Sequence, residues 1–562
     1  MVNPSPRRLT TAAAAFAFML AAPAGAFAQD APKAVAEAPR QVTSGPTPDR
    51  LYVNPQVVVS PKDPASVVMA VPDARNGGCG LQVSRDGGLS WATAAPTLLT
   101  DDYQFCVQRT YGIDMAPVFA PDGTLYVAMP ASSVATGHPN GPISMLVARS
   151  SDLGQTHQTS VVEKAKSSDT YTLPDGSKAV GLEQDKLPSI AVDPTNSNKV
   201  YVSWRLSIRG PDQAPLPGFS LGGPNGIPSR TMLAVSEDGG STWGAPVDIM
   251  DTFKAEKVNG SGYASLVTAP DGTVYGFTRE SPPRAATGQP SAKARLFMFK
   301  STDGGKTWTT SVVSEGVQQS DDPQAAITPD GHLLLAYSAR GASTTNDVPP
   351  NASEVYTMSS ADGGQTWSKP INVTDDNPAR HADQYLPGIS VAQNGRVTVA
   401  FYDYRNDPFY SPGEVGNMNA AVDEHYWDVY LTSSTDNGAT WAANTRVTES
   451  PVYNKVGISF NNQDIRGPIG MASTNSAAYV SWPDTRATTA SNSDAEDAYF
   501  SRVRFSDPAP LGADTSGSSG WAWGLGGVGV GLAIGGVVLF ALRKSGGANQ
   551  PAKSAGRVPS IG

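Results

Sequence analysis

Five arginines occupy corresponding positions in the sequence, each at the end of an apolar segment with the alternation of a β-strand. A guanidinium group binds a carboxylate through two parallel hydrogen bonds, so arginines that converge would form a pocket for an anionic ligand. The five arginines are Arg205, Arg279, Arg340, Arg405 and Arg486.

Aspartates precede the neighbouring apolar segments, and they offer the arginines a different role. Paired with them, the arginines would form a ring of ion pairs that ties successive structural units together. The sequence leaves both interpretations open, an anion pocket or a ring of Arg–Asp pairs. The aspartates are Asp114, Asp185, Asp322, Asp383 and Asp464.

The apolar segments repeat as strand, short turn and strand. Examples are "PVFAPDGTLYVAM" from Pro117 and "AAITPDGHLLLAY" from Ala325. A third strand and a fourth follow in each unit. Each unit is therefore predicted to be a four-stranded antiparallel meander of roughly 50 to 80 residues, which is typical of a propeller blade.

Near-copies of one eight-residue motif lie between the third and fourth predicted strands. Its Asp carboxylate can accept backbone amides, its glycines allow positive φ, and its Trp can pack against a neighbouring sheet. The motif therefore predicts a tight hairpin turn and no chemistry. The six copies are "SRDGGLSW" from Ser84, "SSDLGQTH" from Ser150, "SEDGGSTW" from Ser236, "STDGGKTW" from Ser301, "SADGGQTW" from Ser360 and "STDNGATW" from Ser434.

One more unit follows the six that carry the motif. It supplies three strands, in "PIGMASTNSAAYVSWPDTR" from Pro468 and "DAYFSRVRF" from Asp497. Its fourth strand is expected from the N-terminal segment 29–50, which would close the ring. The expected fold is all-β, a propeller of seven four-stranded blades over residues 51–506, with six blades as the alternative.

The strand order predicts which rim of the propeller could do chemistry. The turn motifs all lie on one rim, whereas the loops between second and third strands lie on the other. These loops are long after Arg205, Arg279, Asp403 and Pro483. Binding sites usually form on long loops held by a rigid scaffold, so the arginine-bearing rim is the candidate functional rim.

The pattern S-x-D-x-G-x-[ST]-W, repeated around short meanders, resembles the Asp-box or BNR-repeat propellers of the sialidase superfamily. The resemblance covers roughly residues 50–506 and concerns the fold first, because a fold does not determine an activity. It implies a glycoside hydrolase of exo-α-sialidase type, which removes terminal sialic acid or a related acidic sugar.

The resemblance also implies roles for individual residues. Sialidases surround the sugar carboxylate with three arginines and use a Tyr nucleophile, a Glu partner and an Asp acid/base. Carried over to this chain, three of Arg279, Arg340, Arg405 and Arg486 would bind the carboxylate. Tyr404 or Tyr402 would be the nucleophile with Glu280 beside it, and Asp185 or Asp383 would be the acid/base.

The chain departs from the sialidase pattern at one signature. Many sialidases carry Arg-Ile-Pro ahead of the first Asp box, and this chain has no such string. The nearest is "QDIRGPIG" from Gln463, which lies near the other end. The alternative function is therefore a non-catalytic propeller that binds a glycan or a cell-surface protein.

The two ends of the chain predict export and anchoring. Residues 1–28 combine Arg7 and Arg8, an apolar run and a small-x-small site, as in a signal peptide. Residues 521–542 carry no charge and are long enough for a transmembrane helix. Residues 507–520 would then be a flexible linker and 543–562 a cytoplasmic tail, with the propeller on the cell surface.

The net charge limits the classes of ligand that the chain is expected to bind, and the cysteine count predicts one disulfide. The chain has 51 acidic and 41 basic residues, and without the terminal segments 35 bases remain, a net charge of −16. A nucleic acid partner is therefore not expected, whereas a glycan or cell-surface ligand is. Cys79 and Cys106, the only cysteines, are expected to form a disulfide. No metal-ligand spacing is present, so no metal or cofactor is expected.

Overall fold

The structure, a computed structural model, describes most of the propeller region and neither terminus of the chain. The predicted signal peptide 1–28, linker 507–520 and tail 543–562 lie outside the described residues. Those residues are 33–43, 52–73, 77–106, 115–132, 143–165, 169–172, 178–209, 229–249, 252, 263–280, 294–317, 322–340, 353–376, 382–409, 425–453, 467–487 and 496–506.

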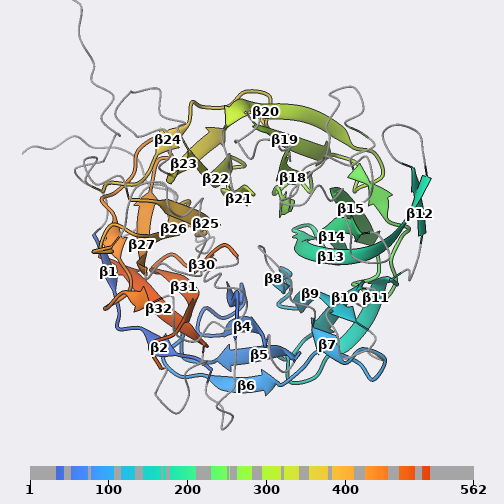
Figure 1. The fold of residues 1–562 in the computed structure, drawn as a ribbon, viewed down its shortest axis with the longest axis horizontal. Helices are drawn as coiled ribbons and strands as arrows, with labels where there is room; N and C mark the ends of the chain where they lie inside the picture. Colours follow the sequence, from blue (N-terminus) through green and yellow to red (C-terminus); the bar gives the residue numbers. More distant parts are fainter. Residues whose placement is uncertain are drawn as a thin grey trace, which may run out of the picture. The chain divides into compact units, whose positions relative to one another are not determined.

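The described strands form seven antiparallel sheets arranged around a ring, as Figure 1 shows. The chain is thus an all-β propeller, and the prediction of seven blades is confirmed. The first sheet contains β3 (Gln56–Val59), β4 (Val67–Pro72), β5 (Cys79–Ser84) and β6 (Ala92–Ala95). The second contains β7 (Phe105–Cys106), β8 (Ala116–Phe119), β9 (Leu125–Ser132), β10 (Ile143–Ser150) and β11 (Gln158–Glu163).

The next three sheets follow in chain order. The third contains β12 (Asp169–Thr172), β13 (Lys178–Asp193), β14 (Asn196–Arg209), β15 (Ser229–Ser236) and β16 (Val247–Asp248). The fourth contains β17 (Ser265–Thr268), β18 (Val274–Arg279), β19 (Ala294–Ser301) and β20 (Thr309–Val317). The fifth contains β21 (Gln324–Ile327), β22 (Leu333–Arg340), β23 (Ser353–Ser360) and β24 (Ile371–Asn372).

The last two sheets complete the ring. The sixth contains β25 (Gln384–Val391), β26 (Val397–Asp403), β27 (Tyr426–Ser434), β28 (Thr445–Arg446) and β29 (Val452–Tyr453). The seventh contains β30 (Gly470–Ser473), β31 (Ala477–Asp484) and β32 (Asp497–Phe505), together with β1 (Ala34–Ala36) and β2 (Arg40–Gln41). The inner strands β3, β8, β13, β17, β21, β25 and β30 contact one another in that cyclic order.

The hydrophobic core lies between the blades. Among the described residues, each pair of neighbouring sheets shares one cluster of buried apolar side chains, and the cluster between blades 7 and 1 includes Met69 and Phe500. Every blade is therefore buried on both faces. Because hydrophobic burial dominates folding stability, each blade depends on its two neighbours.

The N-terminal segment forms the outer edge of the seventh sheet. Both β1 and β2 pair antiparallel with β32, so the first and last strands of the propeller share one blade. Side chains fasten this joint. The hydroxyl of Thr43 donates to the Asp497 carboxylate at 2.9 Å, and Glu37 accepts hydrogen bonds from Arg502 and Arg504.

The six turn motifs adopt one hydrogen-bonding pattern. In the first, the Asp86 carboxylate accepts the backbone amide and hydroxyl of Ser90 at 2.9 and 2.5 Å. The hydroxyl of Ser84 donates to Asp86 at 2.7 Å and accepts the Gly88 amide at 2.8 Å. These bonds, mainly those from Ser90, lower the pKa of Asp86 to about 2. The motif is a self-contained turn, as its residue types predict.

The aromatic residue of the motif links neighbouring blades. Trp91 of blade 1 meets Phe500 of blade 7 edge-on at 5.1 Å between ring centroids. The indole nitrogen of Trp243 in blade 3 donates to the Ser160 hydroxyl of blade 2 at 3.0 Å. Such contacts let each turn fasten its blade to the preceding one.

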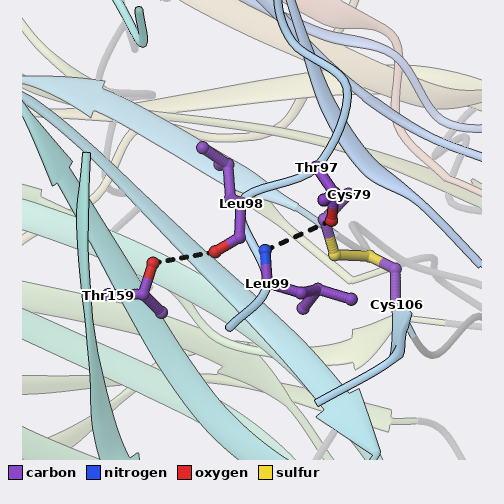
Figure 2. The surroundings of a disulfide bond; sticks show 6 residues. All are labelled: Cys79, Thr97, Leu98, Leu99, Cys106 and Thr159. Atoms are coloured by element: carbon purple, nitrogen blue, oxygen red, sulfur yellow. Dashed lines mark hydrogen bonds between the residues drawn. A yellow bond between two sulfur atoms is a disulfide. The ribbon is translucent and has the colours of Figure 1, made fainter. Parts of the chain in front are cut away.

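The predicted disulfide between Cys79 and Cys106 is confirmed. Cys79 begins β5 and Cys106 ends β7, so the bond joins blade 1 to blade 2 (Figure 2). Both cysteines are buried, and the Leu98 amide beside them donates to the Cys79 carbonyl at 2.9 Å. A cross-link inside a buried joint limits how far two blades can separate.

The fold-class prediction of a C-terminal transmembrane helix is wrong. The described residues contain no α-helix, and none of their elements is a helix long and apolar enough to cross a membrane. Residues 521–542, to which the prediction referred, lie outside the described residues. The fold class is therefore an all-β propeller of seven blades.

The turn motifs predict a loss of stability in acid. Because the pKa of Asp86 is lower in the folded chain than its ordinary 3.8, its stabilising effect is complete above about pH 4 and is lost as the pH falls toward 2. We expect Asp86→Asn to lower the melting temperature at neutral pH and to change it little at about pH 2. Asp101→Asn, at an exposed aspartate, is the control. An equal effect of Asp86→Asn at both pH values would contradict this role.

Candidate functional site

The arginines of the long-loop rim do not share one environment. Arg279 ends β18 and its Nε lies 2.9 Å from a carboxylate oxygen of Asp322, ahead of β21, so this pair ties blade 4 to blade 5. The backbone of Arg340 ends β22, but its side chain is outside the described part of the structure. Asp114 and Asp464 also lie outside the described residues.

Arg405 is the most highly coordinated of these arginines. Its Nε donates to Asp403 at 2.8 Å, Nη1 to Asp375 at 2.7 Å and Nη2 to the Asn444 amide oxygen at 2.9 Å. The guanidinium also lies over the Tyr430 ring, 4.1 Å from its centroid. Asp375 follows the last strand of blade 5, so Arg405 connects blades 5 and 6. Each of the three guanidinium nitrogens thus donates to a group of the chain itself.

The Asp403 carboxyl group shows the electrostatic cost of this arrangement. It is fully buried, and burial raises its pKa to about 6, although Arg405 opposes the shift. A buried carboxylate is tolerated only when it is paired and hydrogen-bonded. Arg405 therefore stabilises the ionised form of Asp403, which is a structural task.

Blade 7 repeats this corner with its own residues. The Arg486 backbone amide and Nε donate to the two carboxylate oxygens of Asp484, each at 2.9 Å. The guanidinium lies over Tyr499 at 4.9 Å. Both corners follow one pattern, Asp-x-Arg at the end of the second strand and Asp-x-Tyr at the third, as in "DTR" and "DAY". The pattern fixes the arginine against its own blade.

Arg205 differs from the three arginines described above. It lies near the middle of β14, opposite Leu187 on β13 and Thr231 on β15. Its Nε is buried and has no hydrogen-bond partner among the described residues. A buried charged donor without a partner carries an unfavourable desolvation energy that a bound anion would remove. The Nη2 of Arg486 also lacks a hydrogen bond of normal geometry within the described structure, but it lies 2.7 Å from an Asp484 carboxylate oxygen. Arg205 is therefore the candidate ligand-binding residue among the rim arginines.

The tyrosines suggested as nucleophiles lie inside the blade 6 core. Tyr404 is fully buried, and its hydroxyl is 2.7 Å from that of Tyr385, whose ring stacks on it at 5.6 Å. Tyr402 is also buried and meets Trp427 edge-on at 5.0 Å. Burial raises the pKa of Tyr402 above its ordinary value. A phenol in this setting resists ionisation.

His425 and Asp407 form a buried pair next to Tyr404. The Nδ1 of His425 lies 2.8 Å from an Asp407 carboxylate oxygen, and the imidazole meets the Tyr404 ring edge-on at 6.0 Å. Asp407 also accepts the backbone amide of Phe409 at 3.0 Å. These contacts fold the chain after β26 back onto the blade, and they hold Tyr404 in place.

Glu280, suggested as the partner of the tyrosine, belongs to blade 4 rather than blade 6. Both of its carboxylate oxygens accept hydrogen bonds from Arg295, each at 2.8 Å. The backbone amide of Glu280 also donates to the Arg295 carbonyl at 2.8 Å. A two-bond pair of this kind is a strong interaction. The described contacts of Glu280 and Tyr404 thus involve different partners in different blades.

Of the two suggested acid/base residues, the structure describes the side chain of Asp383 but not that of Asp185. Asp383 is fully buried beside β25 and accepts the backbone amide of Ser353 at 2.6 Å, which joins blades 5 and 6. Asp185 lies in β13, opposite Ser207, and its side chain is outside the described part. The catalytic roles of these residues stay predictions.

No metal centre is formed within the described parts of the chain. Nowhere in them are three or more His, Cys, Asp or Glu side chains arranged to hold a metal ion. The chemistry available there consists of carboxylates, guanidinium groups, phenols and one buried imidazole.

Several important contact residues were missed by the sequence reasoning. Arg295, Tyr385 and Asn444 carry no motif, because an arginine two residues inside a strand or a lone asparagine has no local signal. The Asp-x-Arg and Asp-x-Tyr pattern of blades 6 and 7 was a usable signal, since its spacing recurs. It would have indicated that Arg405 and Arg486 are bound within their own blades.

Comparison with known proteins finds one matching family model and a group of solved structures with a similar fold. Residues 218–398 match the model described as a BNR repeat-like domain. No curated protein matches the sequence. Among solved structures, the Hadza microbial sialidase Hz136 is 16% identical with a TM-score of 0.40, and the match covers 77% of this chain and 75% of that chain.

Two further solved structures give the same picture. The NanB sialidase of Streptococcus pneumoniae is 11% identical with a TM-score of 0.40, covering 78% of this chain and 83% of that one. The Trypanosoma rangeli sialidase in complex with the inhibitor DANA is 15% identical with a TM-score of 0.41, covering 71% and 56%. At these values the likeness carries no argument about activity.

The Arg405 network predicts a large stability effect at one position. Arg405→Leu leaves Asp403 buried without its cation, and we expect the free energy of unfolding to fall by about 3 to 5 kcal/mol. Arg504→Leu is the control, because that side chain is 63% exposed and such surface pairs contribute about 1 kcal/mol or less. Denaturant unfolding of both variants measures the difference. Wild-type stability in Arg405→Leu would contradict the structural role.

Proposed function

On the premise that this chain is a sialidase-like β-propeller with BNR repeats, we propose that it binds acidic glycans on its long-loop rim. The ligand would carry a carboxylate, as terminal sialic acid and related acidic sugars do. Arg205 would be the residue that binds this carboxylate. Its environment is the observation on which the proposal rests, because its Nε is a buried donor without a described partner.

The other described arginines support the same assignment by contrast. Arg279, Arg405 and Arg486 each bind an aspartate of the chain. A ligand that took one of them would have to break an existing ion pair and leave a carboxylate unpaired. Removing one partner of a buried pair is strongly destabilising. The Nε of Arg205 has no hydrogen-bond partner among the described residues, so a carboxylate could bind there without displacing one.

Binding is favoured over hydrolysis by the state of the tyrosines and of Glu280. The Tyr404 hydroxyl bonds to Tyr385 within a buried stack, and the Glu280 carboxylate is engaged by Arg295. A nucleophile and its base need to lie within hydrogen-bond reach of each other. The described contacts of these two residues instead serve their own blades.

We further propose that the propeller acts outside the cytoplasm. The disulfide between Cys79 and Cys106 supports this location, because disulfides form and persist mainly in oxidising compartments. The predicted signal peptide over residues 1–28 is consistent with the same compartment. Purified exported protein that begins at Gln29 would support this part, and a chain retaining residues 1–28 would contradict it.

Calorimetric titration of the full chain with a sialylated trisaccharide tests the proposed function. We expect binding to this ligand and none to the neutral disaccharide that lacks the sialic acid. In Arg205→Ala, the loss of a charged hydrogen bond of about 1.5 to 3 kcal/mol lowers affinity roughly tenfold to a hundredfold. Arg504→Ala, at the outer edge of blade 7, should bind as the wild type does. Equal affinity in Arg205→Ala and wild type would exclude this assignment.

The same preparation tests hydrolysis with a fluorogenic sialoside. The proposal expects no turnover under conditions where a known sialidase works readily. Turnover that Tyr404→Phe abolishes would favour the sialidase mechanism instead, because that change removes only the hydroxyl. Turnover that survives Tyr404→Phe would show hydrolysis without the suggested nucleophile.

A further inference from the structure

Five carboxyl groups meet at the junction between blades 5 and 6, on the rim that carries the long loops. Glu354 begins the third strand of blade 5, two aspartates follow its fourth strand, and two flank the first hairpin of blade 6. One described cation, Arg405, lies among them. The carboxyl groups, here called the junction acids, belong to Glu354, Asp375, Asp376, Asp383 and Asp403.

The hydrogen bonds of Arg405 reach two of the five junction acids, so three are not bound by it directly. The guanidinium donates to Asp403 and Asp375 and to no other junction acid. Asp383 accepts a backbone amide, that of Ser353. Glu354 and Asp376 are the other two, and no described cation binds either of them directly.

Glu354 is buried among polar side chains. Its side chain is 4% exposed, and it accepts hydrogen bonds from the Thr374 hydroxyl and, at 3.3 Å, from the Asn372 amide. The Oδ2 of Asp376 is buried and has no hydrogen-bond partner among the described residues. Two ionised carboxylates so placed would repel each other in a medium of low dielectric constant.

Gln384 lies beside Asp376 and adds a second buried polar group whose hydrogen bonding is incomplete. It is fully buried, and its side-chain amide faces the carboxyl group of Asp376. Neither its nitrogen nor its oxygen has a hydrogen bond of normal geometry among the described residues. Buried polar groups are nearly always satisfied, and protonation of the facing carboxyl group would give the Gln384 oxygen a hydrogen-bond donor.

We propose that Glu354 and Asp376 together bind one proton at neutral pH, and that release of this proton weakens the junction between blades 5 and 6. The proton removes one negative charge from this pair. It also turns one carboxylate into a hydrogen-bond donor, for which the oxygen of Gln384 is a suitable acceptor. The junction is thus a proton-binding site that makes the propeller firmer in mild acid.

The electrostatics of the pair agree with this assignment. Burial, together with the charge of Asp376, raises the pKa of Glu354 to about 8. Burial also raises the pKa of Asp376, against the opposing effect of Arg405. The other charged or titratable groups beside the pair are Asp403, whose pKa is about 6, Asp375, Arg405 and the buried phenol of Tyr356, whose raised pKa keeps it neutral. Asp383 accepts the amide of Ser353, next to Glu354, and the Tyr337 ring stacks on Tyr356.

The direction of the pH effect follows from linkage. The pKa of Glu354 is higher in the folded chain than its ordinary 4.5. Its contribution to stability is therefore complete below about pH 4.5 and is lost as the pH rises through about 8. The turn-motif carboxylates act in the opposite direction and only below about pH 4, so the two effects fall in separate ranges.

Thermal unfolding of the full chain between about pH 5 and about pH 9 tests the proposal, because a proton lost on unfolding makes stability fall with pH. We expect the wild-type melting temperature to fall over this range. In Glu354→Gln, which keeps the shape and the acceptor for Thr374, the fall should be much smaller. Glu315→Gln, at an exposed glutamate on β20, is the matched control and should follow the wild type.

A direct proton count separates this role from a merely structural one. Calorimetric unfolding at neutral pH, in buffers of different ionisation enthalpy, should show one more proton released by the wild type than by Glu354→Gln. Asp376→Asn serves the same purpose if Glu354→Gln does not fold. Equal proton release in wild type and variants, or parallel pH profiles, would overturn the proposal.

Discussion

The pairing of the first strands with the last one is the interaction on which the rest of the propeller depends. Strands β1 and β2 add to β32, and Glu37 binds Arg502 and Arg504 across the same joint. Every blade buries both faces against its neighbours, so an open ring would expose the apolar faces of blades 7 and 1. The blades therefore bury all of their apolar faces only when β1 and β2 pair with β32 and close the ring.

Polar side chains stabilise the turns on one rim of the ring and the corners between strands on the other. On one rim, short turns satisfy their own amides through an aspartate and fasten each blade to the preceding one. On the other rim, arginines hold the corners between second and third strands, as in the paired geometries of Arg405 and Arg486. This division leaves the long loops free to vary while the strands beneath them stay in place.

Buried charge is unevenly balanced on the long-loop rim. Arg279 and Arg486 each pair with one aspartate, which keeps the cost of burying their charges low. The junction of blades 5 and 6 departs from this rule, with five carboxyl groups around Arg405. Arg205 departs from it in the other direction, as a cation whose Nε has no described partner. Such local imbalances are where binding of a proton or of a ligand has the most effect.

Much of the fold was predictable from the sequence, because its determinants are local. The turn motif "STDGGKTW" forms its hydrogen bonds within itself, and its recurrence between strands indicates repeated blades. The pairing of Cys79 with Cys106 followed from their number alone. The resemblance to BNR-repeat propellers rests on the same local pattern. By contrast, the apolar run near the C-terminus suggested a helix that the described fold does not contain.

The candidate site depended on the tertiary structure. Arg205 and Arg405 follow similar apolar segments in the sequence, yet only the folded chain distinguishes a cation bound by Asp403, Asp375 and Asn444 from one whose Nε has no described partner. Glu354 and Asp376 are ordinary acids in the sequence. The curvature of the ring brings the end of one blade against the start of the next, and burial there changes their chemistry. Local spacing determines the turns and strands, whereas ion pairing and pKa depend on which residues the closed ring places together.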